Sequence, residues 1–337
     1  MADRVTLAQV ADEAGVSAMT VSNVLNGRPG ASDSTRARIS AVAERLGYAP
    51  NLAARGLKGG RSGLIGVMML DLTMQYALEI VRGIADELAV AELETLISAT
   101  YQDGIREFER VDFLTRGVVD GVILVAPVLE QRTLDLLVSR ELPFVVADPR
   151  RIEGDYPRVI VDNYAGMRSA VQYLIDLGHR RVAYLGGDDD FDSSHLRYSG
   201  FADAMKLAGL SMTEQMVVTA DFTYASGFRA ATSILANQRP TAIAAAADVI
   251  ALGAIDAIRA QGLRVPEDIS VTGFDDLPQA TNSFPGLTTV RQPLHDIGST
   301  ATRALLAGLD GSTPVLWRMQ LSTELIVRGS TSAPPRD

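Results

Sequence analysis

Apolar residues recur at spacings of three and four through the first part of the chain, which is the pattern of amphipathic helices. The three apolar stripes consist of Val10, Ala11 and Ala14, of Val21, Val24 and Leu25, and of Ile39, Val42, Ala43 and Leu46. The last stripe lies between Ser32, a suitable N-cap, and Gly47, a suitable helix end. The pattern predicts three short helices whose apolar faces close one small core.

Residues at the ends of the first two stripes predict a helix-turn-helix. Thr6 and Gln9 have the spacing of a capping box, in which each side chain bonds to the other residue's backbone N–H at a helix start. Gly15 supplies the left-handed residue that ends this helix, and Ser17 is a good N-cap for the next one, which extends to about Asn26. Only a tight turn joins the two helices.

The second helix carries candidate base contacts. In DNA-binding helix-turn-helix proteins this helix enters the major groove, and its exposed candidates here are Ala18, Met19, Thr20, Ser22 and Asn23. Asn23 can pair with adenine, Met19 can contact a thymine methyl group, and the hydroxyls suit bases or phosphates. A helical hairpin without a nucleic-acid ligand is the alternative, because this geometry also occurs in proteins that do not bind DNA.

The distribution of charge favours DNA binding by the N-terminal segment. The whole chain has a net charge of −10, but residues 1–62 hold eight basic and five acidic side chains, a net charge of +3. The remainder holds 23 basic and 36 acidic residues, a net charge of −13. A basic segment suits contacts with phosphates, so the acidity belongs to the rest of the chain.

From residue 64 onward, short apolar runs alternate with longer amphipathic stretches, which predicts an α/β fold with parallel sheets. Runs such as "LIGVMML", "GVILVA" and "ISVTGF" are typical of buried strands. Ligands bind at the carboxyl ends of such strands, where the sequence places Asp71, Asp148, Asp188, Asp248, Asp275 and Asp276. Each aspartate could instead cap a helix or form a turn.

Composition argues against several function classes. Without cysteine there is no disulfide, thiol nucleophile or cysteine zinc site, and His179, His195 and His295 fit no metal-binding spacing. "YLGGDDD" lacks the glycine spacing of a dinucleotide site, so no enzyme activity, metal or cofactor is predicted. No apolar run approaches the roughly 18 residues of a membrane span, and the N-terminus lacks a secretion signal. We expect a cytoplasmic protein with no membrane partner.

Motifs spread over nearly the whole chain, to about Val327, occur in an order typical of one family. They include "TLAQVADEAGVS", "TRARISAVAERLGYAPNLAARGL", "LIGVMMLD", "LGHRRVAYLGG" and "VPEDISVTGFDD". With them the chain resembles the lactose/galactose repressor (LacI/GalR) family of bacterial transcription regulators. The resemblance implies an N-terminal all-α helix-turn-helix DNA-binding domain and an α/β effector domain of two lobes, similar to periplasmic binding proteins.

The expected boundaries follow from this resemblance. The helix-turn-helix headpiece spans 1–48 and a hinge helix or linker spans 49–61. One lobe of the effector domain takes 62–161 and 291–318, and the other takes 162–290 and 319–329. The tail, 330–337, is polar and predicted to be disordered, and no leucine heptad follows the body, which favours a dimer over a tetramer.

The resemblance also implies that the hinge docks in the minor groove with Leu57 as a wedge between base steps. Gly56 weakens a helix, so the hinge is expected to order only on DNA, and a simple linker is the alternative. The predicted DNA-binding residues are Thr6, Leu7, Ser17, Ala18, Met19, Thr20, Ser22, Asn23, Asn26, Asn51, Ala54 and Leu57.

The effector contacts implied by the resemblance are Asp71, Met74, Asp148, Ser193, Arg197, Phe222 and Asp275. Asp275 and Arg197 suit the hydroxyls of a sugar and Phe222 its apolar face, although Arg197 and Asp275 could instead form an interlobe ion pair. Ala247 stands where the family usually has Asn, Val125 replaces an often polar residue, and "LDLTMQYA" lacks the usual Asn-Pro-Phe-Phe. A non-sugar effector, such as a nucleoside or aromatic metabolite, or an altered or weak response is therefore the alternative.

These features together predict a sequence-specific transcriptional regulator. We expect an effector-responsive repressor that binds a near-palindromic operator as a homodimer and senses a sugar or sugar-like metabolite. The sequence leaves open whether the effector induces or corepresses, and which operator and genes are involved. The alternative from another class is a solute-binding protein, which shares the two-lobed body but has no use for residues 1–60.

Overall fold

The computed structural model describes residues 5–25, 29–48, 61–149, 154–311 and 318–335. The chain forms two compact units, Met1–Ser62 and Gly63–Asp337. Across the described ranges, no helix is long and apolar enough to cross a membrane.

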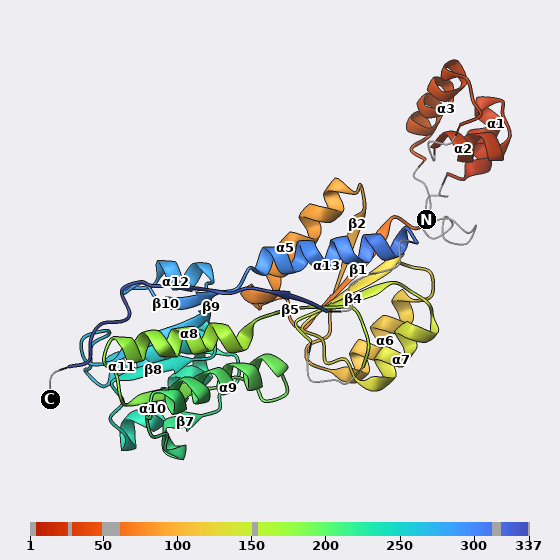
Figure 1. The fold of residues 1–337 in the computed structure, drawn as a ribbon. Helices are drawn as coiled ribbons and strands as arrows, with labels where there is room; N and C mark the ends of the chain where they lie inside the picture. Colours follow the sequence, from red (N-terminus) through yellow and green to blue (C-terminus); the bar gives the residue numbers. More distant parts are fainter. Residues whose placement is uncertain (1–4, 26–28, 49–60, 150–153, 312–317, 336–337) are drawn as a thin grey trace. The chain divides into compact units, whose positions relative to one another are not determined.

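The first unit contains three helices, α1 (Leu7–Ala14), α2 (Ala18–Leu25) and α3 (Asp33–Leu46) (Figure 1). The predicted capping box is confirmed, because Thr6 Oγ1 accepts the N–H of Gln9 and Gln9 Oε1 accepts the N–H of Thr6 at 2.7 Å. Gly15 ends α1 with a φ of 64°. The predicted stripes meet in one core, with members Val10, Ala11, Ala14, Val21, Val24, Ile39, Val42 and Ala43.

The second unit begins with a lobe built on a six-stranded sheet of order β11-β5-β4-β3-β1-β2, in which all neighbours are parallel. Its strands are β1 (Leu64–Met69), β2 (Glu94–Ala99), β3 (Gly121–Val125), β4 (Phe144–Ala147), β5 (Arg158–Val161) and β11 (Arg318–Leu321). Its helices are α5 (Gln75–Val90), α6 (Gly104–Leu114), α7 (Gln131–Ser139) and α13 (Leu294–Leu309). We call this the N-lobe.

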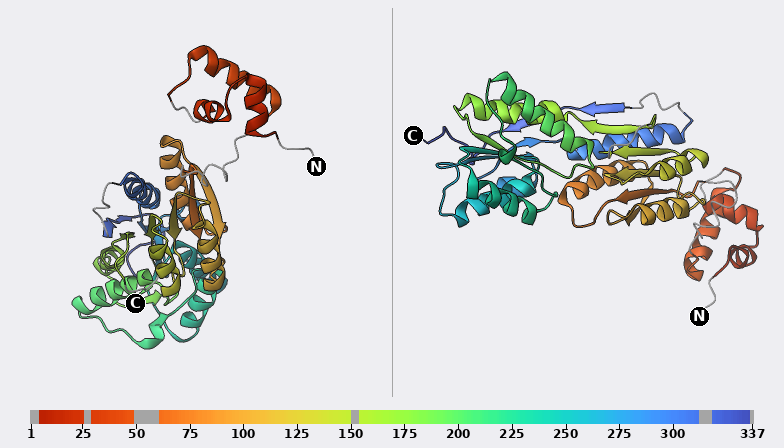
Figure 2. Two further views of the ribbon diagram at one scale, coloured as in Figure 1. Left: turned by 90° about the vertical axis from the view of Figure 1, so that its right-hand side faces the viewer. Right: turned by 90° about the horizontal axis from the view of Figure 1, so that it is seen from below.

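Alternation along the strands gives the N-lobe sheet two apolar faces. Ile65, Val67 and Met69 pack with α5 and α13, whereas Met68 packs with α6 and α7. Figures 1 and 2 show these helix pairs covering the sheet from both sides. The near-continuous apolar runs of the sequence are explained by this double burial.

The second lobe, here the C-lobe, has a sheet of order β12-β10-β9-β8-β6-β7, in which only the β10–β12 pair is antiparallel among the described strands. Its strands are β6 (Val182–Leu185), β7 (Val217–Val218), β8 (Ala242–Ala245), β9 (Ser270–Asp275), β10 (Thr288–Arg291) and β12 (Glu324–Ile326). Its helices are α8 (Asn163–Asp176), α9 (Asp192–Leu207), the 3-10 helix η1 (Glu214–Met216), α10 (Tyr224–Asn237), α11 (Asp248–Ala260) and α12 (Pro278–Asn282).

The chain passes between the lobes after β5, β10 and β11. Two expected boundaries are wrong by a few residues, because β10 continues to Arg291 in the C-lobe and β11 continues to Leu321 in the N-lobe. The boundaries at 290/291 and 318/319 would cut both strands. The short segment "RMQL" has no clear apolar pattern, so its place in the N-lobe sheet depends on pairing with β5, which a local reading cannot detect.

The predicted disorder of the tail is wrong for residues 330–335. Ser330 is fully buried, its Oγ accepts the N–H of Thr288 at 2.8 Å, and its carbonyl accepts the N–H of Val271 at 2.8 Å. Ser332 accepts a bond at its carbonyl from His179 and donates its N–H to Ser270 Oγ at 3.0 Å. Polar composition does not predict order in this tail, because hydrogen bonds of hydroxyl and backbone groups, rather than burial of apolar side chains, hold it in place.

Candidate nucleic-acid interface and effector site

One face of α2 is exposed at the start of the helix, while Val21 and Val24 on the other face are buried in the core of the first unit. Met19 is 69% exposed, and Ala18 beside it is also exposed. Ser17 caps the helix by accepting the N–H of Thr20 at 3.1 Å, which confirms its predicted role as an N-cap. The first turn of α2 is therefore capped and exposed.

The remaining predicted DNA-binding residues lie in three settings. Thr20, Ser22 and Asn23 are half-buried on α2, Thr6 is exposed at the start of α1, and Leu7 is half-buried against the core. The other four predicted residues, Asn26, Asn51, Ala54 and Leu57, lie outside the described residues.

In the second unit, the carboxyl ends of strands bring titratable groups together. Asp148 follows β4 with a φ of 52°, and its Oδ2 accepts a hydrogen bond from the hydroxyl of Tyr76 at 2.9 Å. Burial raises the pKa of Asp148, and the nearby positive charge of Arg197 opposes that rise. Burial likewise raises the pKa of the Tyr76 hydroxyl well above its usual range. Tyr76 was not predicted, since an aromatic in the first turn of a helix carries no local sign of a distant aspartate.

Arg197 is held by several partners inside the C-lobe. Its Nε donates to Asn163 Oδ1 at 2.8 Å, its Nη1 donates to the carbonyl of Ala246 at 2.6 Å, and its guanidinium lies 3.9 Å from the Phe274 ring centroid. Nη1 also lies 3.7 Å from Asp275 Oδ1, so an ion pair is present. The predicted interlobe pair is wrong in one respect, because Arg197 on α9 and Asp275 at the end of β9 belong to the same lobe.

Asp275 is almost fully buried and has the unusual backbone φ of 122°. Its Oδ1 accepts a hydrogen bond from Gln292 Nε2 at 2.6 Å. Burial raises the pKa of Asp275 to about 7, although the charge of Arg197 opposes this rise. Gln292 was not predicted, because it lies in the segment between β10 and α13 and reaches Asp275 only through strand pairing.

Three other aspartates near strand ends accept hydrogen bonds from the protein itself. Asp248 is fully buried and accepts the N–H of Leu277 at 2.8 Å and the hydroxyl of Thr289. Asp71 accepts the N–H of Thr73 at 2.8 Å, and Asp188 accepts the N–H of Asp190 at 3.0 Å. The turn interpretation fits the geometry of Asp71 and Asp188, while an effector contact by Asp71 stays a prediction.

An apolar cluster joins the two lobes. Leu70 and Ala126 of the N-lobe and Phe191 of the C-lobe are buried together, with Met74 and Phe222 packed against them. The rings of Phe191 and Phe222 meet edge to face at a centroid distance of 5.8 Å. Met74 and Phe222 were predicted for the effector site, whereas Phe191 was missed, although an aromatic between a strand and a helix in "DDDFDSSH" is a usable signal.

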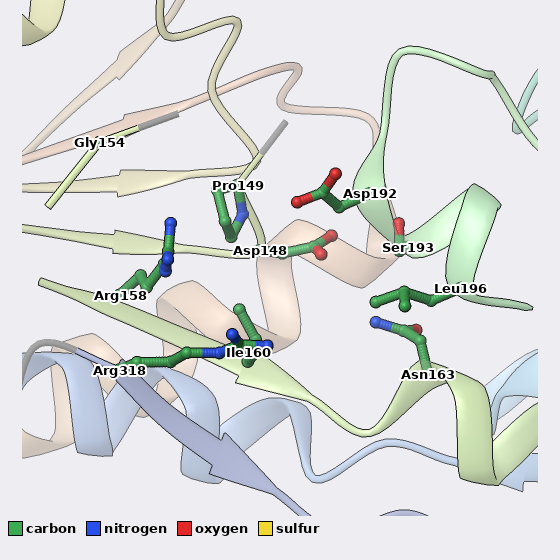
Figure 3. A pocket seen from close by; sticks show the side chains of 10 residues that line it. All are labelled: Asp148, Pro149, Gly154, Arg158, Ile160, Asn163, Asp192, Ser193, Leu196 and Arg318. Carbon is green, nitrogen blue, oxygen red and sulfur yellow. The ribbon is translucent and has the colours of Figure 1, made fainter. Parts of the chain in front are cut away.

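A cavity of about 390 Å³ opens at the junction of the lobes (Figure 3). The residues around it are Asp148, Pro149, Gly154, Arg158, Ile160, Asn163, Asp192, Ser193, Leu196 and Arg318. Of the predicted effector residues only Asp148 and Ser193 line it; the other five, Asp71, Met74, Arg197, Phe222 and Asp275, do not. Its volume suits a small metabolite. No cluster of potential metal ligands is present in the described part of the chain.

Comparison with known proteins agrees with both units. Residues 6–51 match the family described as "Bacterial regulatory proteins, lacI family", and residues 171–331 match the "Periplasmic binding protein-like domain". Catabolite control protein A of Priestia megaterium is 33% identical over 329 residues, covering 97% of this chain and 99% of that protein.

Two solved structures extend the comparison to the fold. The lac repressor dimer bound to operator and the anti-inducer ONPF is 31% identical with a TM-score of 0.89, covering 98% of this chain and 100% of that one. A complex of the transcriptional regulator CelR with cellobiose is 32% identical with a TM-score of 0.76, covering 97% and 100%.

A helix-turn-helix unit and a two-lobed α/β unit in one chain define the class of DNA-binding transcriptional regulators. Within that class, the chain belongs to the LacI family. The family and the function predicted from the sequence are thereby confirmed at this level, and the solute-binding alternative is wrong. Members of this family are regulators rather than enzymes, as the sequence predicted.

Proposed function

We propose that the chain is a homodimeric repressor of a near-palindromic operator, with its DNA affinity set by a small metabolite bound between the lobes. The observation that carries this proposal is the exposed first turn of α2, where Ala18 and Met19 face outward beside a capped turn. Asn23 on the same helix would read adenine, and Thr6, Leu7 and Ser17 would contact the backbone. As a regulator of bacterial genes, the protein would act in the cytoplasm.

Operator binding is tested by selecting sequences from random duplexes and measuring affinity over a salt series. We expect one near-palindromic sequence to be enriched, and its binding to weaken steeply with salt because phosphate contacts release counterions. Equal affinity for the selected and a scrambled duplex would contradict sequence-specific regulation.

The hinge residues are tested by a separate variant. Leu57→Ala should reduce both operator affinity and operator bending if Leu57 is the proposed wedge. Asn51 and Ala54 would contact the groove beside Leu57.

The dimer is proposed to use a groove of about 460 Å³ on the C-lobe. It is formed by α10, α11 and α12, where Leu252 and Ile255 lie beside Phe284, whose side chain is 88% exposed. A second copy of the chain is the proposed occupant, since the lac repressor structure of nearly full coverage is a dimer. Phe284→Ser should therefore weaken self-association in sedimentation experiments. Leu207→Ser, at a 70% exposed position on α9, is the matched control.

The proposed effector is a sugar or a related metabolite. Half-buried Asp148 and buried Ser193, Arg197 and Asp275 offer polar contacts in or near the cavity. Solved structures similar to this chain contain cellobiose or ribose. The apolar cluster around Phe191 favours a second candidate, a nucleoside or aromatic metabolite, which would share the cleft. Calorimetric screening against sugars, nucleosides and aromatic metabolites separates the two. Lobe closure on the ligand would then change operator affinity through differential binding to two states.

A further inference from the structure

Two arginines form one side of the interlobe cavity. Arg158 on β5 and Arg318 on β11 are register partners in neighbouring parallel strands, and both line the cavity. Register partners project from the same face of a sheet. The close-up in Figure 3 shows Arg158 and Arg318 on one side of the cavity and Ser193 and Asn163 on the other.

Within the part of the chain that the structure describes, neither arginine forms an ion pair with a carboxylate. The guanidinium carbon of Arg158 lies 5.0 Å from the ring centroid of Tyr156, a fully buried residue that fixes the arginine by a cation–π contact. None of the ion pairs among the described residues includes Arg158 or Arg318. No ion pair with a carboxylate of the described residues therefore neutralises the positive charge of either arginine beside the cavity.

Acidic and hydroxyl groups also line the cavity. Asp192 and Ser193 at the start of α9 line the cavity together with Asp148 (Figure 3). Carboxylates and a serine hydroxyl accept hydrogen bonds from ligand hydroxyls, whereas the two carboxylates would repel an anion. Two basic side chains, from β5 and β11, therefore line the cavity together with two acids, Asp148 at the end of β4 and Asp192 at the start of α9.

We propose that this cavity takes a hydroxylated metabolite that carries an anionic group, a phosphate or a carboxylate. Arg158 and Arg318 would hold the anionic oxygens, because a guanidinium presents paired donors that match such groups. Asp192, Asp148 and Ser193 would hold the hydroxyls. The inference rests on the proposed function in taking the interlobe cavity as the effector site, and it narrows the class of effector.

The test is calorimetric titration of the full-length protein with four probes: glucose, glucose 6-phosphate, glucuronate and inorganic phosphate. We expect at least one charged sugar to bind more tightly than glucose, with an advantage that shrinks as salt is raised. A preference for glucose 6-phosphate or for glucuronate identifies phosphate or carboxylate as the anionic group. Glucose bound as tightly as both charged sugars, no binding of either charged sugar, or inorganic phosphate bound as tightly as the sugar phosphate would overturn the proposal.

Variants assign the effect to the arginines. Arg158→Gln and Arg318→Gln should each weaken binding of the charged sugar about tenfold, while leaving any glucose affinity unchanged. Arg158→Lys keeps the charge and should lose less, which separates recognition of the anion from damage to the fold. Arg116→Gln, whose arginine follows α6 and has a 67% exposed side chain, is the control. Retained preference for the charged sugar in both Gln variants would refute the assignment.

The proposed function is tested independently by operator binding of the same preparations. If operator binding is present but no charged sugar binds, the regulator stands and the anionic effector fails. If a charged sugar binds through the arginines but no operator is selected, the site stands and the proposed regulation fails.

Discussion

At the scale of single residues, Arg197 organises the charged groups where strands of the C-lobe end. It bonds to Asn163 and to the carbonyl of Ala246, and it lies 3.7 Å from Asp275. A buried guanidinium needs such partners because desolvation of an unpaired charge is costly. Gln292 completes the shell around Asp275, so neither charge is left without a hydrogen bond.

The buried position of Asp275 predicts a pH-dependent contribution to stability. Its pKa of about 7 lies above the ordinary value of 3.8, so between these values the folded state retains a proton that the unfolded state has released. This contribution favours folding at low pH and is lost as pH rises from about 4 to about 7. In Asp275→Asn it should be absent. The free energy of unfolding of the unmodified protein, relative to this variant, should fall over that range in urea titrations.

Asp135→Asn, at an exposed position on α7, serves as the control for this pH series. Asp275 and Asp248 influence each other, since their negative charges are close, so the measured change belongs to the pair. A difference between the unmodified protein and Asp275→Asn that stays constant with pH would contradict the proton-linked role.

Asn23 provides the residue-scale prediction for DNA reading. Asn23→Ala should reduce discrimination at one base pair by roughly 1–3 kcal/mol, because a bidentate contact to adenine would be lost. Affinities for the selected operator and for single-base variants of it measure this effect. Asp12→Ala, exposed on α1, is the control. Equal loss of affinity on specific and random DNA would instead make Asn23 a backbone contact.

At the scale of elements, the headpiece was predictable because its signals are local. Thr6, Gln9, Gly15 and Ser17 act within a few residues of their own positions, and the structure confirms the caps and the turn. The α/β order of the body was equally readable from buried strands. Two features could not be predicted from the sequence: the lobe in which "RMQL" pairs, and the docking of the tail through Ser330. Both depend on partners far along the chain.

The candidate site shows the same division. The apolar runs placed Asp148 and Asp275 correctly at the ends of strands, whereas Arg197, which approaches Asp275, came from the family resemblance alone. Their partners Tyr76 and Gln292 come from other elements and carry no local signature. A sequence pattern therefore finds the residues that follow strands, whereas three-dimensional pairing decides which groups hold them.

Close contact between α5 and α13 leads to a prediction at the scale of elements. A methyl group on Gly298 would overlap the carbonyl oxygen of Ile80, and one on Gly83 would overlap that of His295. Both obstacles are backbone atoms, so the helices must separate to admit a side chain. Gly298→Ala should lower the free energy of unfolding by at least about 1–3 kcal/mol, measured by urea denaturation. Asp296→Ala, a 69% exposed position on the same helix, is the control, and equal stability of Gly298→Ala would contradict the close packing.

At the scale of the whole molecule, the two units differ in net charge, and the chain connects the two lobes of the second unit several times. The segment 1–62 is net positive while the rest carries −13, so the overall charge of −10 says little about the DNA-binding surface. Three passages of the chain between the lobes connect the two sheets, and the apolar cluster at Phe191 joins their facing ends. A movement of one lobe relative to the other must therefore change the packing of that cluster.

This coupling predicts the effect of Phe191→Ala. Phe191 is buried in a cluster that contains Leu70 and Ala126 of the other lobe. Removing its ring should destabilise this arrangement of the lobes by roughly 3–5 kcal/mol. The balance between lobe arrangements should shift, and a ligand that works by biasing this balance should change operator affinity less than in the unmodified protein. The measurement is operator affinity with and without the effector identified by calorimetry, and Phe113→Ala, 53% exposed on α6, is the control. If Phe191→Ala leaves both operator affinity and its response to the effector unchanged, the cluster only packs the lobes and does not transmit the signal.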